Sequence, residues 1–187
     1  MRPLKRLNLP PDDAELRALP VGQEVLLNGE ALTLRDATLA RLDSLVSSGG
    51  RPPFDLDGQL VFHSGPTPPA AGRPCGAIGP TSSARMDHLL PLLFGLGVRA
   101  TLGKGPRSEE ATALHERYGA VYLAAVGGTA ALYGGMVEAM ETIAWEDLGP
   151  EAVYRVWLRD FPAVVAIDAR GEDHLRAQYI LYRSRDT

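Results

Sequence analysis

Short apolar segments alternate with segments of helical periodicity through the middle of the chain, and this alternation restricts the possible folds most strongly. The apolar segments have the length and composition of strands, and between them apolar residues recur at helical spacing. Expected strands cover residues 59–63, a segment that ends at Gly79, 98–103 and 120–126, and expected helices cover 83–94 and 108–118. This order predicts parallel β/α units around a buried sheet.

The segments on either side of this region predict further strands and helices. Asn28-Gly29 separates two apolar runs, VLL and ALTL, and this dipeptide is typical of a hairpin turn. A helix is expected to begin with Asp36 as its N-cap and to end at Gly49-Gly50. Further strands are expected over residues 4–9, 136–145, 153–158 and 163–168, and further helices over 129–133 and 172–182. We therefore expect an α/β fold, with a mixed sheet and flanking helices.

The length and charge of the chain restrict its partners. We expect one domain over residues 1–187, since domains commonly have about 100 to 200 residues. The net charge is −4 and there is no basic cluster, so neither nucleic acid nor an anionic membrane surface is an expected partner. The sequence has no apolar run of the ~18 residues that a membrane span needs and no secretory signal, so a cytoplasmic location is expected.

Cys75 is the only cysteine in the sequence. One cysteine cannot form an intrachain disulfide or supply the several thiolates of a zinc or iron-sulfur site. His63, His88, His115 and His174 lack the i, i+4 spacing of a helical metal-binding pair, and structural or surface roles are expected for them. We expect no metal ligands in this chain, so a reaction that needs a metal centre would take it from another chain.

The sequence GAIGPTSSARMD, residues 76–87, has the composition of an anion-binding turn. If a strand ends just before the turn and a helix begins at Ser83, unpaired backbone N–H groups and the positive end of the helix dipole meet at one place. Thr81 and Ser82 add hydroxyl donors there, and Arg85 adds a planar guanidinium that suits a carboxylate. The alternative is that Thr81 or Ser82 only caps the helix and that Arg85 points into solvent.

Two further cationic residues are expected at strand ends. Gly103-Lys104-Gly105 follows an expected strand, and the carboxyl ends of parallel neighbours share the edge of the sheet at which ligands bind. The glycines would let a ligand approach the backbone closely, although an isolated Gly-Lys-Gly is more often a surface turn. Arg35 lies in a similar position, between a strand and a helix. Arg35, Arg85 and Lys104 together predict a site for a small dianion, and they specify no reaction.

A series of motifs resembles one known family. In order along the chain, the motifs are LNGEALTLRDATLAR, FHSGPTP, GAIGPTSSARMD, LGKG, YLAAVGG and WEDLGPEAVYRVWLRDFPAVVAIDARGEDH. They span most of residues 20–175, and the last is specific, with its W-x-D-L-G-x-E-A and D-F-P-A cores. They resemble the β subunit, or C-terminal domain, of the iron-sulfur hydro-lyases that comprise class I fumarases and L-tartrate dehydratases.

The resemblance implies a fold, an activity and a partner. It implies the swivelling β/β/α fold and the reversible hydration of fumarate to (S)-malate, with an α subunit whose three cysteines hold a 4Fe-4S cluster. This chain alone would be inactive, and the implied assembly is a dimer of αβ pairs. The alternatives are the β subunit of an L-tartrate dehydratase, which forms oxaloacetate, and a non-catalytic dicarboxylate-binding module.

The resemblance also implies roles for individual residues. Arg35, Arg85 and Lys104 match the cations that bind the substrate carboxylates, and Ser82 is expected to bind substrate beside them. Thr81 matches the residue that takes a proton from the carbon next to a carboxylate, and Lys104 is assigned to catalysis with it.

Other positions are ambiguous or depart from the family pattern. Asp36 either caps its helix or supports the site from behind. The proton acceptor for the threonine hydroxyl is either Asp36 or a group on the α subunit. Leu34 stands before Arg35 where the family commonly has glycine, Leu39 replaces a histidine, and Ala84 replaces the glycine of S-G-R. The retained cations imply dicarboxylate binding, while the missing histidine implies an altered substrate preference or an impaired member of the family.

Overall fold

The computed structural model of the protein describes residues 3–183. Its elements are, in order, β1 (Lys5–Leu9), α1 (Asp13–Arg17), β2 (Glu24–Thr33), α2 (Asp36–Ser47), β3 (Leu60–Phe62), the 3-10 helix η1 (Ser83–Leu89), α3 (Leu90–Gly95), β4 (Ala100–Gly103), α4 (Glu109–Tyr118), β5 (Val121–Ala124), α5 (Ala130–Gly134), β6 (Val137–Ala144), the 3-10 helix η2 (Glu146–Glu151), β7 (Val153–Ile167) and α6 (His174–Arg183). Residues 1–2 and 184–187, which the expected domain of 1–187 also includes, lie outside the described residues.

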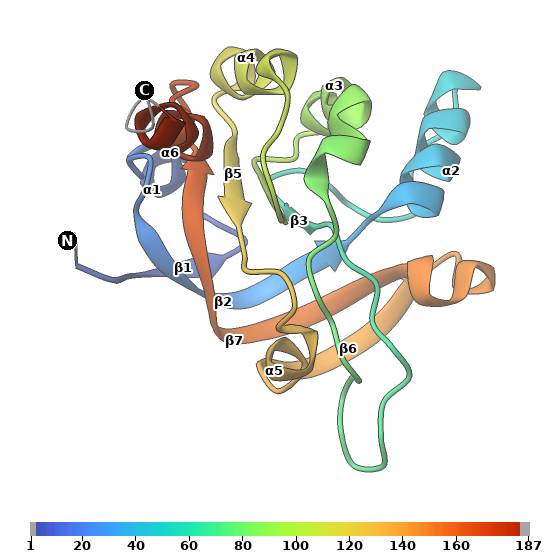
Figure 1. The fold of residues 1–187 in the computed structure, drawn as a ribbon. Coiled ribbons are helices and arrows are strands. Elements are labelled where there is room, and N and C mark those ends of the chain that lie inside the picture. Colours follow the sequence, from blue (N-terminus) through green and yellow to red (C-terminus); the bar gives the residue numbers. More distant parts are fainter. Residues whose placement is uncertain (1–2, 184–187) are drawn as a thin grey trace.

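Within residues 3–183 seven strands form one mixed sheet (Figure 1). The strands β2, β3, β4 and β5 are successive parallel neighbours. Among them β3, β4 and β5 confirm predicted strands of the parallel units, and the mixed sheet with its helices confirms the α/β class. β7 is antiparallel to β2, β5 and β6. Because β7 pairs with both β2 and β5, the strands β2, β3, β4, β5 and β7 close into a ring. Because β2, β3, β4 and β5 are parallel to one another, their carboxyl ends lie at the same edge of the sheet.

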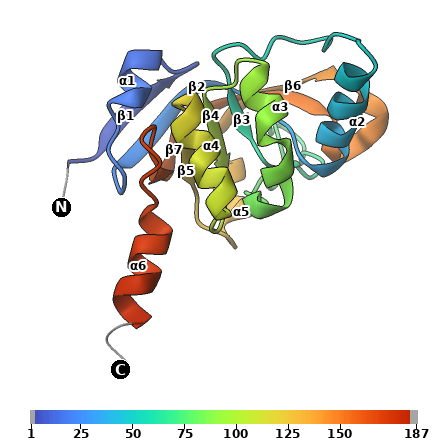
Figure 2. The same cartoon turned by 90° about the horizontal axis from the view of Figure 1, so that it is seen from above.

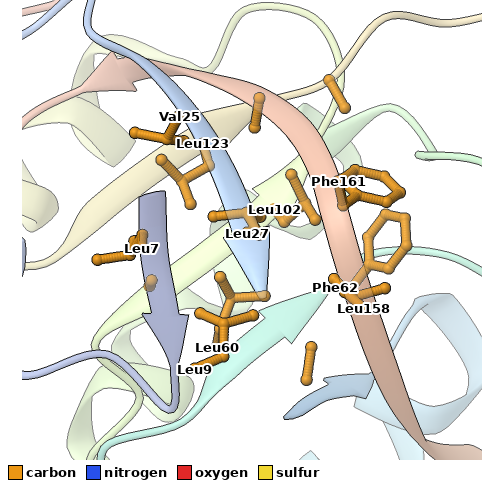
Figure 3. Close-up of a cluster of buried hydrophobic side chains, with 14 of the residues drawn as sticks. Leu7, Leu9, Val25, Leu27, Leu60, Phe62, Leu102, Leu123, Leu158 and Phe161 are labelled. Carbon is orange, nitrogen blue, oxygen red and sulfur yellow. The ribbon is translucent and has the colours of Figure 1, made fainter. Parts of the chain in front are cut away.

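The ring strands separate two hydrophobic clusters. Leu60 and Phe62 of β3 belong to an inner cluster, where Phe62 meets Phe161 edge-on with ring centroids 5.4 Å apart (Figure 3). Val61, between them in the sequence, belongs to an outer cluster that helices α2, α3 and α4 cover (Figure 1). Successive side chains of a strand point to opposite faces, so a continuous apolar strand such as β3 is buried on both.

The hairpin turn predicted at Asn28-Gly29 is wrong, because both residues lie within the continuous strand β2. The register of β2 against β7 shifts between Leu27 and Gly29. Gly29 has a φ of 114°, and an added Cβ would lie 2.4 Å from the carbonyl oxygen of Leu9. The side-chain oxygen of Asn28 accepts a hydrogen bond from the N–H of Asp160 at 3.0 Å. The dipeptide forms a β-bulge, which uses the same positive φ that a hairpin turn requires.

The strand expected to end at Gly79 does not form. The N–H of Ala77 donates to Thr67 Oγ1 at 2.8 Å, and the N–H of Ile78 donates to the carbonyl of Ala130 at 3.0 Å. This segment is therefore held by Thr67 and by the first residue of α5, and not by a neighbouring strand.

Two more expectations differ from the structure in where elements are joined or divided. The strands expected over residues 153–158 and 163–168 are one strand, β7, and Asp160 at its centre has a φ of 46°. The helix expected over residues 83–94 is divided into η1 and α3, with Pro91 in the first turn of α3. Proline has no N–H to donate to a preceding turn, so a new helix begins there.

The C-terminal helix α6 confirms the helix expected over residues 172–182 and projects from the rest of the molecule (Figure 2). Its side chains Tyr179 and Ile180 are exposed. Across residues 3–183, none of the helices has both the length and the apolar character that crossing a bilayer requires.

Candidate functional site

The expected site residues lie beyond the carboxyl ends of neighbouring parallel strands. Arg35 follows β2 after one intervening residue, and Lys104 directly follows β4. His63, directly after β3 between them, accepts a hydrogen bond at its carbonyl from the N–H of Thr81 at 2.7 Å. The turn that carries Thr81 is thereby placed at the same edge, so the structure brings together the segments that the sequence predicted.

The turn over residues 81–83 pairs with Lys104 through the backbone. The Lys104 N–H donates to the Thr81 carbonyl at 3.1 Å, and the Ser83 N–H donates to the Lys104 carbonyl at 3.0 Å. A Cβ on Gly103 would lie 1.9 Å from Ser83 Oγ. Gly103 is therefore required for contact between two segments of the chain, a role that the sequence analysis missed when it considered only access for a ligand.

The side chain of Lys104 extends toward the loop that follows β5. A Cβ added to Gly127 would lie 3.2 Å from Lys104 Cδ and 3.6 Å from Lys104 Nζ. The small residue at Gly127 leaves room for the lysine side chain, which is partly exposed.

The guanidinium of Arg85 connects Thr81 to Asp36. Its Nη2 donates to Thr81 Oγ1 at 2.7 Å and to Asp36 Oδ2 at 2.8 Å. Arg35 Nε donates to the same oxygen of Asp36 at 3.3 Å. Asp36 therefore lies between the two arginines, and both guanidiniums remain partly accessible, with side-chain exposures of 26% for Arg35 and 50% for Arg85.

Helix capping does not account for these side chains. Arg35, and not Asp36, is the N-cap residue of α2, and Asp36 is the first residue of the helix. Ser82 is the N-cap residue of η1, but its side chain makes no capping hydrogen bond, and it is exposed. The alternative in which Thr81 or Ser82 acts only as a cap is thus not what the structure shows.

The pKa of Asp36 lies below its ordinary value. Partial burial acts to raise this pKa, but a backbone hydrogen bond and the charges of Arg85 and Arg35 outweigh that effect. The carboxylate is therefore ionised at neutral pH and is a weak base, which disfavours it as a proton acceptor for the Thr81 hydroxyl.

Glu151 completes a charged cluster with Arg35, Asp36 and Arg85, a role that the sequence did not predict. Its Oε1 lies 3.4 Å from Arg35 Nε, and its Oε2 accepts a hydrogen bond from the Ala37 N–H at 2.7 Å. The Thr38 hydroxyl also donates to the Glu151 carbonyl. Glu151 belongs to the motif L-G-P-E-A, but nothing in the local pattern shows that η2 folds back onto the start of α2.

The positions that depart from the family pattern are mainly apolar core positions in this chain. Leu34 and Leu39 are both fully buried in the outer hydrophobic cluster, whereas Ala84 is exposed. The leucine in place of the family's histidine thus fills space beneath α2.

A cavity of about 310 Å³ lies beside the two linked side chains Asp36 and Arg85, between α2 and η1. Asp43 and His88 also line it. A larger cavity of about 650 Å³ lies near α6, with Val126, Val164 and Leu175 among the apolar side chains of its wall. The smaller cavity has two carboxylates, Asp36 and Asp43, against the one guanidinium of Arg85, so its charges do not favour a dianion. Arg35, Thr81 and Lys104 are not among the residues that line it.

A metal ion requires several ligand side chains arranged close together. Among residues 3–183, no three His, Cys, Asp or Glu side chains form a group that could hold a metal ion. Cys75 is buried, and burial raises the pKa of its thiol.

Comparison with known proteins identifies relatives of the chain. The family model described as Fumarase C-terminus matches residues 3–177. "Fumarate hydratase class I, anaerobic" of Escherichia coli (strain K12) is 33% identical over 174 residues, which are 92% of this chain and 31% of that protein. "Fumarate hydratase 1, mitochondrial" of Leishmania major is 34% identical over 161 residues, which are 85% of this chain and 29% of that protein.

A further relative has a length similar to that of this chain. The "Putative L(+)-tartrate dehydratase subunit beta" of Methanocaldococcus jannaschii is 36% identical over 163 residues, which are 84% of this chain and 84% of that protein. By contrast, this chain spans less than a third of the fumarate hydratases above. With the family model matching nearly the whole described chain, the protein belongs to the Fumarase C-terminus family.

Proposed function

We propose that this chain is the β subunit of a fumarate hydratase, which interconverts fumarate and (S)-malate together with an α subunit that carries a 4Fe-4S cluster. The observation that carries the proposal is the convergence of Arg35, Arg85, Thr81 and Lys104 at one edge of the sheet. Relatives named as fumarate hydratases support the reaction, and the relative named "subunit beta" supports a partner subunit that supplies the rest of the site.

The charge balance of the cluster supports a contribution from that partner. Arg35, Arg85 and Lys104 carry three positive charges, while Asp36 and Glu151, which pair with the arginines, carry two negative charges. The difference of three and two leaves one net positive charge for a substrate with two negative charges. A second chain would supply the remaining positive charge.

Each residue of the cluster has a chemical role in this proposal. Arg35, Arg85, Lys104 and Ser82 bind the carboxylates, and the cations stabilise the charge that develops on one carboxylate when the neighbouring C–H bond breaks. Thr81 acts as an alkoxide: its hydroxyl proton first passes to a group on the α subunit, and the hydrogen bond from Arg85 stabilises the negative charge left on Oγ. The Oγ then takes the proton from the substrate carbon. Asp36 holds the two guanidiniums in position. A bound 4Fe-4S cluster supplies Lewis-acid chemistry toward the departing hydroxyl group.

The proposal extends to the whole assembly. Residues 1–187 form one swivelling β/β/α domain, which closes over the substrate as the lid of a site shared with the α subunit. Two αβ pairs form a dimer, the assembly acts in the cytoplasm, and neither nucleic acid nor a membrane is a partner.

A tartrate dehydratase is the second candidate function. The relative from Methanocaldococcus jannaschii favours it, because its name includes L(+)-tartrate and "subunit beta" and because the two chains cover each other over most of their lengths. The charged cluster suits both malate and tartrate, which differ in one hydroxyl group.

The decisive experiment is anaerobic co-expression with the candidate α subunit, reconstitution of the cluster, and competitive assay of malate, fumarate and both tartrate enantiomers. We expect turnover of malate and fumarate by the complex and none by this chain alone. Preferential turnover of L-tartrate would support the second candidate. Binding of dicarboxylates without turnover of any of them would leave only a dicarboxylate-binding module.

A further inference from the structure

Arg107 is a buried arginine outside the cluster described above. It lies between β4 and α4, and the exposed fraction of its side chain is 0%. Its guanidinium donates hydrogen bonds to the Ser83 carbonyl at 3.1 Å, Asp87 Oδ1 at 2.5 Å, Thr101 Oγ1 at 3.1 Å and His63 Nε2 at 3.1 Å. One side chain thus contacts three separate segments of the chain.

The contact with His63 extends to the residue before Arg35. His63 Nδ1 lies 2.9 Å from the Leu34 carbonyl oxygen. A guanidinium only donates and a carbonyl only accepts, so Nε2 must accept from Arg107 and Nδ1 must carry the proton. This requires a neutral imidazole, and burial together with the charge of Arg107 lowers the pKa of His63 to about 3. The result is a fixed chain of hydrogen bonds from Arg107 through His63 to Leu34.

The same guanidinium is connected to the other two site segments. Its acceptor Ser83 belongs to the turn that carries Thr81, and the Ser83 N–H is bonded to the carbonyl of Lys104. Its acceptor Thr101 lies on β4, three residues before Lys104. The His63 carbonyl accepts from the Thr81 N–H, so the hydrogen bonds of these segments form one network around Arg107.

We propose that Arg107 is a positioning residue that holds the segments bearing Arg35, Thr81 and Lys104 at the spacing a dicarboxylate requires. These segments carry the residues of the proposed site, so the inference rests on the proposed function. Arg107 itself is buried beneath the site and does not touch the substrate.

The groups around the side chain of residue 107 explain why that residue is an arginine. A planar guanidinium offers several N–H donors in fixed directions, whereas a lysine presents one compact ammonium group. The Tyr122 ring, 4.6 Å from the guanidinium carbon, and the carboxylate of Asp87 offset part of the cost of burying the charge. A purely structural position could be filled by an apolar side chain at lower desolvation cost.

The test compares Arg107→Met and Arg107→Lys with Leu16→Ala, a core variant in α1 whose apolar side chain takes no part in the hydrogen-bond network around Arg107. In the full chain, backbone hydrogen exchange is measured at the N–H groups of Thr81, Ser83 and Lys104. We expect exchange at least about tenfold faster in both Arg107 variants than in Leu16→Ala, after correction for global stability. Exchange that matches the core variant would overturn the proposal.

A kinetic measurement on the reconstituted αβ complex completes the test. We expect Arg107→Lys, which keeps the charge and is the variant better able to fold, to raise KM for the dicarboxylate about tenfold, while Leu16→Ala leaves KM unchanged. An unchanged KM in Arg107→Lys would overturn the positioning role. If the wild-type complex has no hydratase activity, the proposed function fails, and the exchange measurement still decides the role of Arg107 by itself.

Discussion

At the scale of single residues, the site depends on how carboxylates hold the arginines. Asp36 contacts both guanidiniums, and Glu151 adds a second contact to Arg35 from the distant segment η2. These ion pairs are partly exposed, so they contribute little to the stability of the fold. Their main effect is to orient the guanidinium N–H groups toward a ligand.

Removal of Arg85 tests the core of the cluster. We expect Arg85→Ala in the reconstituted complex to lower kcat/KM by about 30- to 1,000-fold, because about 2 to 4 kcal/mol of transition-state stabilisation is lost with a charged donor. Steady-state kinetics with Arg159→Ala, an exposed arginine paired with Glu138, provides the control. Turnover of the two variants at the same rate would remove Arg85 from the site.

Glu151 allows a more conservative test. Glu151→Gln keeps an oxygen for the Ala37 N–H but removes the charge that faces Arg35, so we expect KM to rise about threefold to tenfold. Glu146→Gln, at an exposed position of the same 3-10 helix, should leave KM unchanged in the same assay. Equal values of KM for the two variants would contradict the role given to Glu151.

The buried histidines give a prediction for stability against pH. Burial lowers the pKa of His115 to about 3, so the folded chain stays unprotonated there while the unfolded chain takes up a proton below about pH 6.5. Stability is therefore lost as the pH falls from about 6.5 toward 3. Between pH 7 and pH 5, we expect the free energy of unfolding of His115→Leu to fall by about 2 kcal/mol less than that of the wild type, as measured by urea unfolding. Parallel losses in both proteins would show that His115 does not contribute.

At the scale of elements, the bulge in β2 shows how a correct local signal gave a wrong element. The Asn-Gly pair does mark a positive φ, but the same backbone geometry serves a turn or a bulge. Which of the two forms depends on β7, more than a hundred residues away, whose Asp160 N–H binds Asn28. No pattern within the first forty residues contains that partner.

The bulge can be tested by substitution. Gly29→Ala combines a strained φ with a close contact to the Leu9 carbonyl, so we expect a loss of about 3 kcal/mol in the free energy of unfolding. Gly72→Ala has a φ of 75° but open space around an added Cβ, and it should cost only about 1 kcal/mol. Equal losses in urea unfolding would mean that the contact with Leu9 is unimportant.

At the scale of the whole molecule, the four parallel strands determine where the site forms. The sequence predicted three of them, β3, β4 and β5, because each of these β/α units has a local pattern and a topological rule places the strand ends at one edge. It predicted a hairpin in place of β2. It did not predict that β7 closes the ring by pairing with β2 and β5, or that Arg107 and Glu151 connect the site segments. Those contacts join residues far apart in the chain, and buried charges leave no periodic signal.

The central claim is that cations from separate strands bind both ends of one dicarboxylate. The most direct measurement is the ratio of the inhibition constants of butyrate and succinate for the reconstituted complex, in the wild type and in Arg35→Ala, Arg85→Ala and Lys104→Ala. We predict that succinate inhibits at least about 100-fold more strongly than butyrate, and that each substitution lowers this ratio about tenfold. A ratio near one in the wild type, or a ratio in all three variants that equals that of the wild type, would contradict the claim.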